Sequence, residues 1–258
     1  MSLLHEIFSV KTKGNKKIIR ILGIKFTKKI LSDEVTKTLS SMHVTVLDPD
    51  NKIFVIENGQ EKEVPSDYFV GLKITLKGKN NIIKIHAPFK FFTSRLEING
   101  ENNLFEIETT GYAVRDVHFS MMSLANNRKI SIGNQFACGG ALIVNNVSGN
   151  TITIWDDCMF GRDIIVRADD GHVICQKGTK KIINNSSGTK IGNHVWIAQR
   201  TFVGKDVEIG DNSVVGACSV ITKGSTEQNV VWAGVPARII KRDIDWYRVN
   251  HNSDMFER

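Results

Sequence analysis

A histidine and a carboxylate stand two residues apart in one polar stretch of the chain, and they are the first candidates for chemistry. Asp170 and His172 belong to ADDGHVICQKGTKKIINNSSGTK, residues 168–190, which also contains Asp169. An imidazole with an ordinary pKa of about 6.5 can take up a proton near neutral pH, and a carboxylate nearby can orient or polarise it. The pair therefore suits a general base that activates a hydroxyl. The alternative is a surface histidine in a polar loop.

Other kinds of site have weaker support in the sequence. His194 is the rival base, but it stands in a regular repeat position that favours a structural role. No His, Cys or Asp cluster has the spacing of zinc ligands, and no G-x-S-x-G elbow presents a nucleophilic serine. We therefore expect no metal. The cysteines lack C-x-x-C spacing and lie in or near repeat sequence, which favours core thiols in a reducing compartment: Cys138, Cys158, Cys175 and Cys218.

A six-residue repeat next to this stretch must position the candidate residues. Residues 191–225 divide into IGNHVW, IAQRTF, VGKDVE, IGDNSV, VGACSV and ITKGS. The first place is always β-branched and aliphatic, and the second is nearly always small. A period of six fits neither a helix face nor an alternating strand, but it is a known β-helix period. With the aliphatic residue pointing inward at each corner of a triangular prism, the repeat predicts a left-handed parallel β-helix.

The irregular sequence before and after the repeat predicts the domain organisation. KGKNNIIKI at 77–85 recurs as NGENNLFEI at 99–107, which indicates earlier coils with enlarged corners. Residues 17–26 could form a strand or an amphipathic segment on a membrane surface, and residues 44–56 resemble a hairpin. We therefore predict three parts: a β-rich N-terminal cap at 1–70, the β-helix at 71–228 with a loop at 168–190, and a C-terminal segment at 229–258 with a short helix at 243–249.

The chain of 258 residues carries a formal net charge of +7, much of it near the start. Eight basic residues lie among the first thirty: Lys11, Lys13, Lys16, Lys17, Arg20, Lys25, Lys28 and Lys29. They could form a solvated arm, or a surface for anionic lipid or an anionic polymer. Nucleic acid is not expected, because no recognition motif or interleaved aromatics accompany the charge. With no apolar run of membrane-spanning length and no good signal peptide, we expect a cytoplasmic protein, either free or at the inner face of the membrane.

Four motifs together resemble one family of enzymes. They are DGHVI at 170–174, IGNHVWI at 191–197, VVGACSVITKG at 214–224 and AGVPARII at 233–240. The sequence is similar to the hexapeptide-repeat acyltransferases, in the branch with galactoside, maltose and polysaccharide (sialic acid) O-acetyltransferases. The similarity covers roughly residues 130–242. It implies direct transfer of an acetyl group from acetyl-CoA to a sugar hydroxyl, with His172 as the general base and no acyl-enzyme.

The resemblance also implies roles for further residues. Trp196 follows His172 by 24 residues, a spacing similar to that of the histidine and tryptophan that line the site in polysaccharide O-acetyltransferases. The family's contacts to the cofactor map onto Ala198, Ala217, Thr222, Lys223 and Arg238. Members of the family pack as homotrimers around a threefold axis, so each active site would lie between two subunits.

Two departures from the family pattern affect this carry-over. Ala198 occupies a place where glycine is commoner, which could alter the cofactor channel. The acceptor-binding asparagine of the galactoside enzymes would fall near residues 139–141, and there is none. We expect an O-acetyltransferase acting on a bacterial surface sugar, capsular or exopolysaccharide. The alternatives are an N-acyltransferase of an amino sugar nucleotide and a non-catalytic β-helix scaffold.

Overall fold

The computed structural model describes residues 8–13, 16–21, 24–27 and 50–249, and within these ranges every regular element is a β-strand. The chain divides into two compact units, residues 1–47 and 48–258. The first contains an antiparallel sheet of β1 (Phe8–Lys13), β2 (Lys16–Ile21) and β3 (Ile24–Thr27), in that order. Most of residues 17–26 therefore lie in strands, which confirms the strand and not the amphipathic segment as their structure. In the described ranges, no helix has the length and apolarity that a membrane crossing requires.

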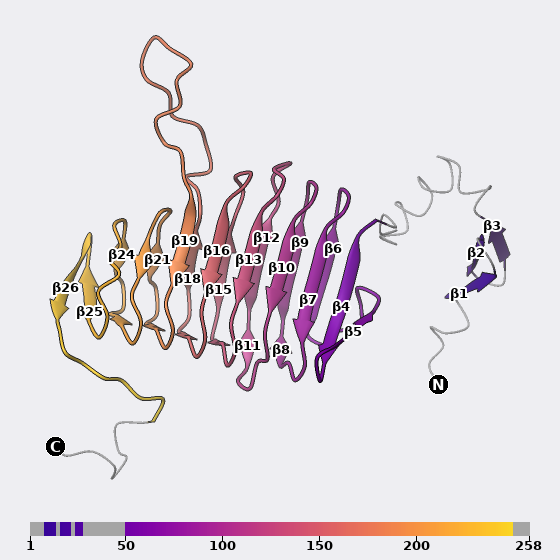
Figure 1. The fold of residues 1–258 in the computed structure, drawn as a ribbon, viewed down its shortest axis with the longest axis horizontal. Helices are drawn as coiled ribbons and strands as arrows, with labels where there is room; N and C mark the ends of the chain where they lie inside the picture. The colour runs from indigo at the N-terminus through magenta and orange to yellow at the C-terminus, as the bar shows by residue number, and fades with distance from the viewer. Residues whose placement is uncertain (1–7, 14–15, 22–23, 28–49, 250–258) are drawn as a thin grey trace. The chain divides into compact units, whose positions relative to one another are not determined.

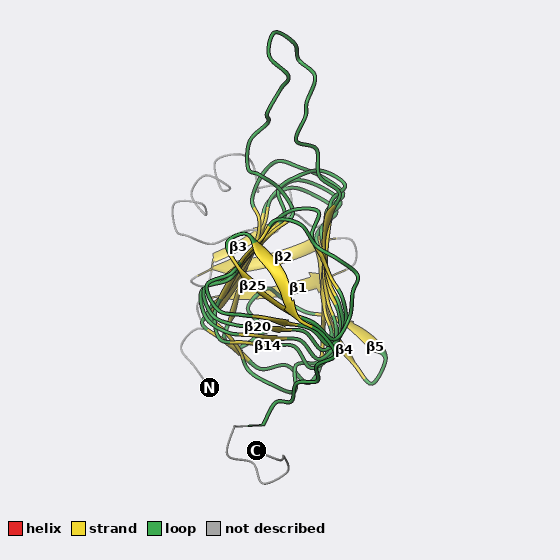
Figure 2. Ribbon diagram, turned by 90° about the vertical axis from the view of Figure 1, so that its left-hand side faces the viewer, coloured by secondary structure: helices red, strands yellow, loops and turns green. Residues whose placement is uncertain are grey.

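The second unit is a left-handed parallel β-helix with three flat faces, as Figures 1 and 2 show. Face 1 consists of β4 (Lys52–Glu57), β5 (Gln60–Glu63), β7 (Ile82–His86), β10 (Leu104–Ile107), β13 (Lys129–Ile132), β16 (Thr151–Ile154), β19 (Gly188–Ile191) and β22 (Glu208–Ile209). Face 2 consists of β8 (Phe91–Phe92), β11 (Val114–Arg115), β14 (Ala137–Cys138), β17 (Met159–Phe160), β20 (Trp196–Ile197), β23 (Val214–Val215), β25 (Val231–Gly234) and β26 (Ala237–Lys241). Face 3 consists of β6 (Leu72–Leu76), β9 (Ser94–Ile98), β12 (Val117–Met121), β15 (Ala141–Val144), β18 (Ile164–Arg167), β21 (Phe202–Val203) and β24 (Val220–Ile221). The chain runs from face 1 to face 2 to face 3 and back, so the edges are called the 1–2, 2–3 and 3–1 corners.

The core of the β-helix is the stack of inward aliphatic residues that the sequence repeat predicts. Equivalent residues of successive coils pair in register, for example Ile154 with Ile191 and Ile191 with Ile209. All six first-place residues of the repeat are at most 1% exposed: Ile191, Ile197, Val203, Ile209, Val215 and Ile221. The irregular repeat between residues 77–85 and 99–107 also forms successive coils, because Ile83 pairs with Phe105, 22 residues later. The predicted fold class is confirmed.

The β-helix begins earlier than the sequence indicated. β4 pairs in parallel with β7, with Ile53 opposite Ile83, so the first coil starts near residue 52 and not after residue 70. Residues 57–65 include β5, and a turn at Asn58 and Gly59 with φ of 51° and 76° returns the chain antiparallel to β4. Of the hairpin expected at 44–56, residues 44–49 lie outside the described residues. The wide, irregular corners of these coils hide the period of the repeat.

The short helix predicted at 243–249 is wrong. The segment is extended and contains no regular element. Its residues contact loops of several successive coils along the 1–2 corner, from Asn229 back to Gln135. An extended chain advances about 3.3 Å per residue and a helix only about 1.5 Å, so an extended chain is what can reach across coils stacked about 4.8 Å apart.

The four cysteines divide into two kinds. Cys138 and Cys158 are buried, and burial raises the pKa of each thiol to about 12, which makes them inert core residues as predicted. Cys175 and Cys218 are exposed, which corrects the expectation that all four belong to the core. All four are free thiols.

The stacked core makes a prediction about stability. Ile191→Ala removes a fully buried side chain from the column between Ile154 and Ile209, and we expect it to destabilise the β-helix by about 2–5 kcal/mol. The exposed neighbour Lys190 is the matched control, and Lys190→Ala should change stability by less than about 1 kcal/mol. Thermal unfolding followed by circular dichroism measures both. Equal midpoints for the two variants would contradict the stacked core.

Candidate functional site

The polar stretch predicted as an interruption of the coils forms an arm, residues 169–187, at the 3–1 corner. It leaves the prism after β18 and returns at β19, and Figures 1 and 2 show it projecting away from the body. Its two limbs pair through a bridge between Cys175 and Ile182 and a hydrogen bond from Ile183 N to Ile174 O of 2.9 Å. The arm exposes four aliphatic side chains: Val173, Ile174, Ile182 and Ile183.

A single buried asparagine holds the two ends of the arm together. Asn150 Nδ2 donates to Ala168 O at 2.8 Å and to Ser186 Oγ at 2.7 Å, and Asn150 is only 3% exposed. Ser187 Oγ and N donate to the Asp206 carboxylate of the next coil, at 2.9 and 2.6 Å. The root of the arm is therefore fixed to the coils on both sides.

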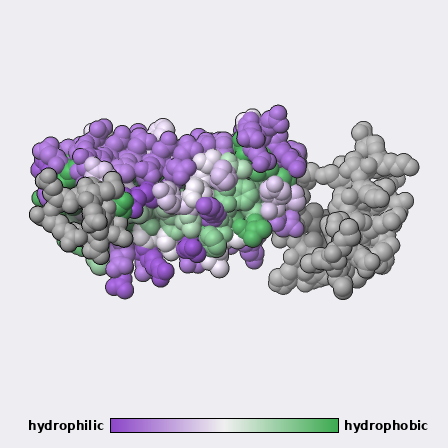
Figure 3. Space-filling view, turned by 90° about the horizontal axis from the view of Figure 1, so that it is seen from below, coloured by the Kyte–Doolittle hydropathy of each residue, from purple (hydrophilic) through white to green (hydrophobic). Residues whose placement is uncertain are grey.

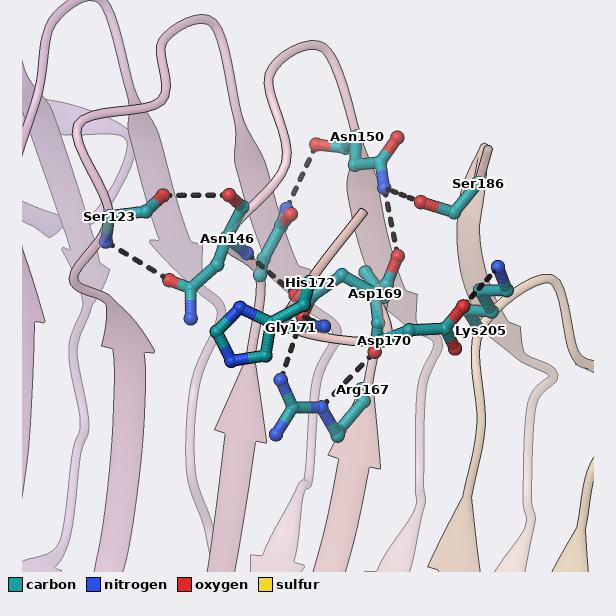
Figure 4. Close-up of polar contacts among 12 residues, drawn as sticks. Ser123, Asn146, Asn150, Arg167, Asp169, Asp170, Gly171, His172, Ser186 and Lys205 are labelled. Atoms are coloured by element: carbon teal, nitrogen blue, oxygen red, sulfur yellow. Dashed lines mark hydrogen bonds and ion pairs between the residues drawn. The ribbon is translucent and has the colours of Figure 1, made fainter. Parts of the chain in front are cut away.

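Asp169 is the carboxylate that fixes the turn carrying His172. It is buried, and its two oxygens accept hydrogen bonds from Arg167 Nη2 at 2.7 Å, Gly171 N at 2.8 Å and Asn146 N at 2.9 Å (Figure 4). Gly171 has a φ of 83°, a conformation that a residue with a side chain adopts only under strain. These contacts determine the direction in which the chain presents His172. The sequence placed Asp169 in this stretch but gave no sign that it would be the buried anchor.

Asp170 has a different role from the one suggested by its spacing to His172. Its carboxylate lies 2.5 Å from Lys205 Nζ and accepts from Asn184 Nδ2 at 3.0 Å. The hydrogen bonds from Lys205 and Asn184 lower the pKa of Asp170 below its ordinary value. Asp170 and His172 both lie within the described residues, and the Asp170 carboxylate makes no hydrogen bond to the His172 ring. Asp170 joins the two limbs of the arm, because Asn184 Nδ2 also donates to His172 O at 2.8 Å.

The His172 side chain is exposed, and neither ring nitrogen has a hydrogen-bond partner among residues 50–249. Figure 4 shows the ring beside the turn, with the guanidinium of Arg167 below it. Because no protein group occupies its nitrogens, the imidazole is available to accept a proton from a bound molecule.

His194, the rival candidate, is fully engaged in holding the C-terminal segment. Its Nδ1 lies 2.6 Å from Asp157 Oδ2 and its Nε2 lies 3.0 Å from Trp246 O, while its ring stacks on the Trp246 indole with centroids 4.0 Å apart. Trp246 Nε1 donates to His194 O at 2.8 Å. Arg248 Nε completes the cluster with a 2.8 Å contact to Asp157 Oδ1. This arrangement supports the structural role that its repeat position favoured.

The structure places Trp196 and His172 on different parts of the prism. Trp196 lies on face 2, in β20, and is 37% exposed, whereas His172 lies at the 3–1 corner. The residues predicted to contact the cofactor are also dispersed. Ala198 and Ala217 lie at the 2–3 corner, Thr222 and Lys223 follow β24 at the 3–1 corner, and Arg238 lies in β26. One copy of the chain does not bring these residues together.

The outer surfaces of the three faces differ in character. On face 2 the outward ladder is apolar: Ala137, Met159, Trp196, Val214 and Val231. On face 3 the outward ladder of the later coils is also apolar, with Leu142, Ile165, Phe202 and Val220, whereas the earlier coils present Lys73, Arg95 and His118. Face 1 presents polar residues instead, including Lys129, Ser131, Thr151, Thr153, Lys190 and Glu208. Figure 3, which views the side where β8 and β11 lie in Figure 1, shows a hydrophobic band framed by hydrophilic side chains.

Two other features are separate from His172. A hollow of about 490 Å³ at the 2–3 corner is lined by residues that include Gly139, Gly140, Leu142 and Arg162, the region where the galactoside enzymes' asparagine would map. On face 1, His86 lies with Glu106 and Glu108 in an arrangement that could hold a cation, which sequence spacing did not reveal. There, His86 Nδ1 already lies 2.9 Å from Glu108 Oε2, and Lys129 Nζ lies 3.8 Å from Glu106 Oε2, so both carboxylates have close contacts within the protein.

Comparisons with known proteins agree on one group of relatives. The family model "Bacterial transferase hexapeptide (six repeats)" matches residues 188–223. A polysialic acid O-acetyltransferase of Escherichia coli O1:K1 / APEC is 34% identical over 122 residues, which are 47% of this chain and 39% of that protein. The polysialic acid O-acetyltransferase of Neisseria meningitidis is 33% identical over 189 residues, covering 72% of this chain and 84% of that protein. The crystal structure of the polysialic acid-specific acetyltransferase NeuO superposes with a TM-score of 0.66 and 27% identity, covering 80% of this chain and 88% of that one.

The contrast between the two histidines generates a prediction. His194→Ala removes the stacked ring and two hydrogen-bonded nitrogens, and we expect it to destabilise the protein by about 2–4 kcal/mol and to release the C-terminal segment. His172→Ala, the matched control, removes an exposed ring and should change stability by less than about 0.5 kcal/mol. Thermal unfolding and limited trypsin cleavage near Arg242 and Arg248 measure the two effects. Equal protease resistance of both variants would contradict the assigned role of His194.

Proposed function

This chain belongs to the hexapeptide-repeat acetyltransferases, and from that premise we propose that it transfers an acetyl group from acetyl-CoA to a hydroxyl of a bacterial surface polysaccharide. The observation that carries the proposal is the exposed His172, whose ring is unpartnered in the described residues and is held on a turn anchored by the buried Asp169. The names of the relatives, two of them polysialic acid O-acetyltransferases, support a polysaccharide acceptor.

The proposed mechanism is direct transfer. His172 takes the proton of the sugar hydroxyl while the hydroxyl oxygen attacks the thioester carbonyl carbon of acetyl-CoA. The new C–O bond forms, the C–S bond breaks, and the proton on His172 passes to the departing thiolate. No acyl-enzyme is needed, and Asp169 acts through the turn as a positioning residue.

We propose that the working unit is a homotrimer. Face 2 and the later coils of face 3 present apolar ladders and meet at the 2–3 corner, so three prisms can bury these surfaces by placing face 2 of one copy against face 3 of the next around that corner. The outer rim of such an interface brings the 3–1 corner of one copy, with His172, to the side of face 2 of the next, with Trp196. The separation of these residues within one chain supports a site completed by the partner.

The proposed cofactor residues lie at two corners of the prism and in β26. Ala198 and Ala217 are small residues beside face 2, and they would let the pantetheine arm of acetyl-CoA lie close to the backbone. Thr222 and Lys223 lie at the 3–1 corner, as His172 does. Lys223 and Arg238 are exposed and could contact the phosphates, as a point charge and as a planar fork. We propose no role for a metal in this reaction.

We further propose a cytoplasmic location, where acetyl-CoA is available, with the basic N-terminal unit bringing the enzyme to an anionic polymer or to the inner face of the membrane. The support is the charge of the sequence, with eight basic residues between positions 11 and 29.

The base makes the first prediction about activity. His172→Ala should reduce acceptor-dependent release of CoA thiol from acetyl-CoA by about 100-fold or more, because the hydroxyl loses the group that takes its proton. Thiol release is measured against a panel of sugars, nucleotide sugars and capsule polymers, with binding of acetyl-CoA by calorimetry as the control for folding. Undiminished turnover in the variant would remove His172 from the mechanism. If the wild type shows no turnover and does not bind acetyl-CoA, the enzyme proposal fails and the non-catalytic scaffold is left.

The composite site makes a second prediction. His172→Ala and Trp196→Ala trimers should each be impaired, yet trimers that contain both kinds of chain should regain about one third of the wild-type sites, because one of their three interfaces then receives both intact residues from different chains. Co-expression with two affinity tags, followed by the thiol assay, tests this. If mixed trimers are no more active than the single variants, the two residues do not act across an interface.

A further inference from the structure

The His86 imidazole on face 1 has one ring nitrogen that the surrounding protein does not pair. His86 ends β7, and its Nδ1 lies 2.9 Å from Glu108 Oε2. The other nitrogen, Nε2, is closed off from solvent and has no hydrogen-bond partner among residues 50–249. Buried polar atoms in proteins are nearly always paired, so an unpaired one points to a further group that belongs beside it.

The groups around the ring indicate what kind of ligand would fit. A carboxylate oxygen only accepts, so the contact with Glu108 places the proton of a neutral imidazole on Nδ1 and a lone pair on Nε2. That lone pair faces Glu106 Oε1 at 3.6 Å, which is longer than a hydrogen bond. Two acceptors thus face each other with no donor between them. A cation that both can ligate would satisfy the two together.

The distances suit a metal ion. Zinc binds imidazole nitrogen and carboxylate oxygen at about 2.0–2.2 Å, so two ligands of one tetrahedral ion lie about 3.4 Å apart. The 3.6 Å between His86 Nε2 and Glu106 Oε1 is close to that separation. Ligand-type atoms of His86, Glu106 and Glu108 all lie within 4.8 Å of one another. These side chains are 21%, 24% and 35% exposed, so water can reach the ion and complete its coordination.

The pairing of two adjacent coils holds these side chains together. β7 and β10 are parallel neighbours, with Lys84 opposite Glu106 and Ile85 opposite Ile107. Residues of a strand alternate between the two sides of the sheet, so the outward pair after Lys84 and Glu106 is His86 and Glu108. The site is not visible as a sequence motif, because a full coil of the chain separates the histidine from both glutamates.

The lysines nearby do not occupy the space beside His86 Nε2. Lys84 Nζ is paired with Glu61 Oε1. Lys129 Nζ lies 3.8 Å from Glu106 Oε2, which is the oxygen that does not face His86. The Lys129 side chain is 40% exposed, so it can move into solvent at little cost when a divalent cation binds.

We propose that face 1 carries a zinc-binding site in which His86 Nε2 and Glu106 Oε1 are the protein ligands and Glu108 holds the ring through its Nδ1 proton. An imidazole with a carboxylate suits zinc, and a second carboxylate on the other ring nitrogen fixes the tautomer and strengthens the ligand. The ion joins β7 to β10 near the start of the β-helix, where it stabilises the first coils. The site is separate from His172 and does not depend on the proposed function.

The test is zinc binding by the full-length protein without an affinity tag, after treatment with a chelator and its removal. Zinc chloride should bind, and the thermal unfolding midpoint should rise by about 5–10 °C when free zinc is about 100 times its Kd. Magnesium chloride at the same concentration should do neither, because Mg²⁺ prefers oxygen ligands. By calorimetry, His86→Gln, Glu106→Gln and Glu108→Gln should each weaken zinc binding by about 10-fold or more.

His118→Gln is the matched control. His118 is an outward histidine that is 20% exposed and contacts a glutamate, since its Nε2 lies 2.6 Å from Glu97 Oε2. Its Nδ1, however, already lies 2.9 Å from Arg95 Nη2, so both of its nitrogens have partners. Its replacement should leave zinc binding unchanged.

Three results would overturn the site. Equal zinc binding by the wild type and by folded His86→Gln and Glu106→Gln would place the zinc elsewhere on the chain. A wild type that binds no zinc would leave the cluster without a metal. A midpoint that rises on acidification but not with zinc would assign the Nε2 lone pair to a proton. None of these measurements involves acetyl transfer, so the proposed function stands or fails separately.

Discussion

Everything in this protein depends on the hydrogen bonding of one coil to the next. Each coil must present its backbone groups in register with its neighbours, and the inward side chains must then stack in straight columns. Such columns favour inward apolar residues, and in the regular repeat β-branched aliphatics recur at the first place of each six. An insertion cannot enter a column without breaking the register, so extra residues must leave at a corner. The arm at 169–187 is the largest such departure, and it carries the candidate base.

The arm leaves the prism, so its conformation depends on contacts that fix its root. Polar side chains that are buried at the 3–1 corner provide this fixation. Asn150 holds both ends of the arm, and Asp169 holds the turn before His172. Each of these buried groups is satisfied by several partners, so its burial costs little and its geometry is well defined. The two adjacent carboxylates divide the work, since Asp169 sets the turn from inside the corner while Asp170 joins the limbs of the arm through Lys205 and Asn184 outside it.

The outer surfaces of the prism connect this local order to function. A β-helix could be a monomer with three solvated faces, but here face 2 and the later coils of face 3 present apolar ladders, and these two faces meet at one corner. His172 and Trp196 lie apart on a single chain. The proposed threefold assembly would account for both observations, because burying the apolar surfaces would also bring the separated residues to one rim. The C-terminal segment lies beside face 2 at the 1–2 corner. Its Trp246 stacks on His194, and the ring centroid of Trp246 lies 6.0 Å from that of Trp196.

The sequence by itself determined the β-helix, the place of the arm and the histidine to examine, because a strict period of six and its single break are visible in the order of residues. It could not locate the first coil at residue 52, since wide corners conceal the period there, and it misread 243–249 as a helix because those side chains find their partners across several coils. Only the tertiary structure decided which of two adjacent aspartates is buried and that His194 holds Trp246. These outcomes depend on contacts between residues of different coils or on the path of a turn, and neither is encoded in spacing along the chain.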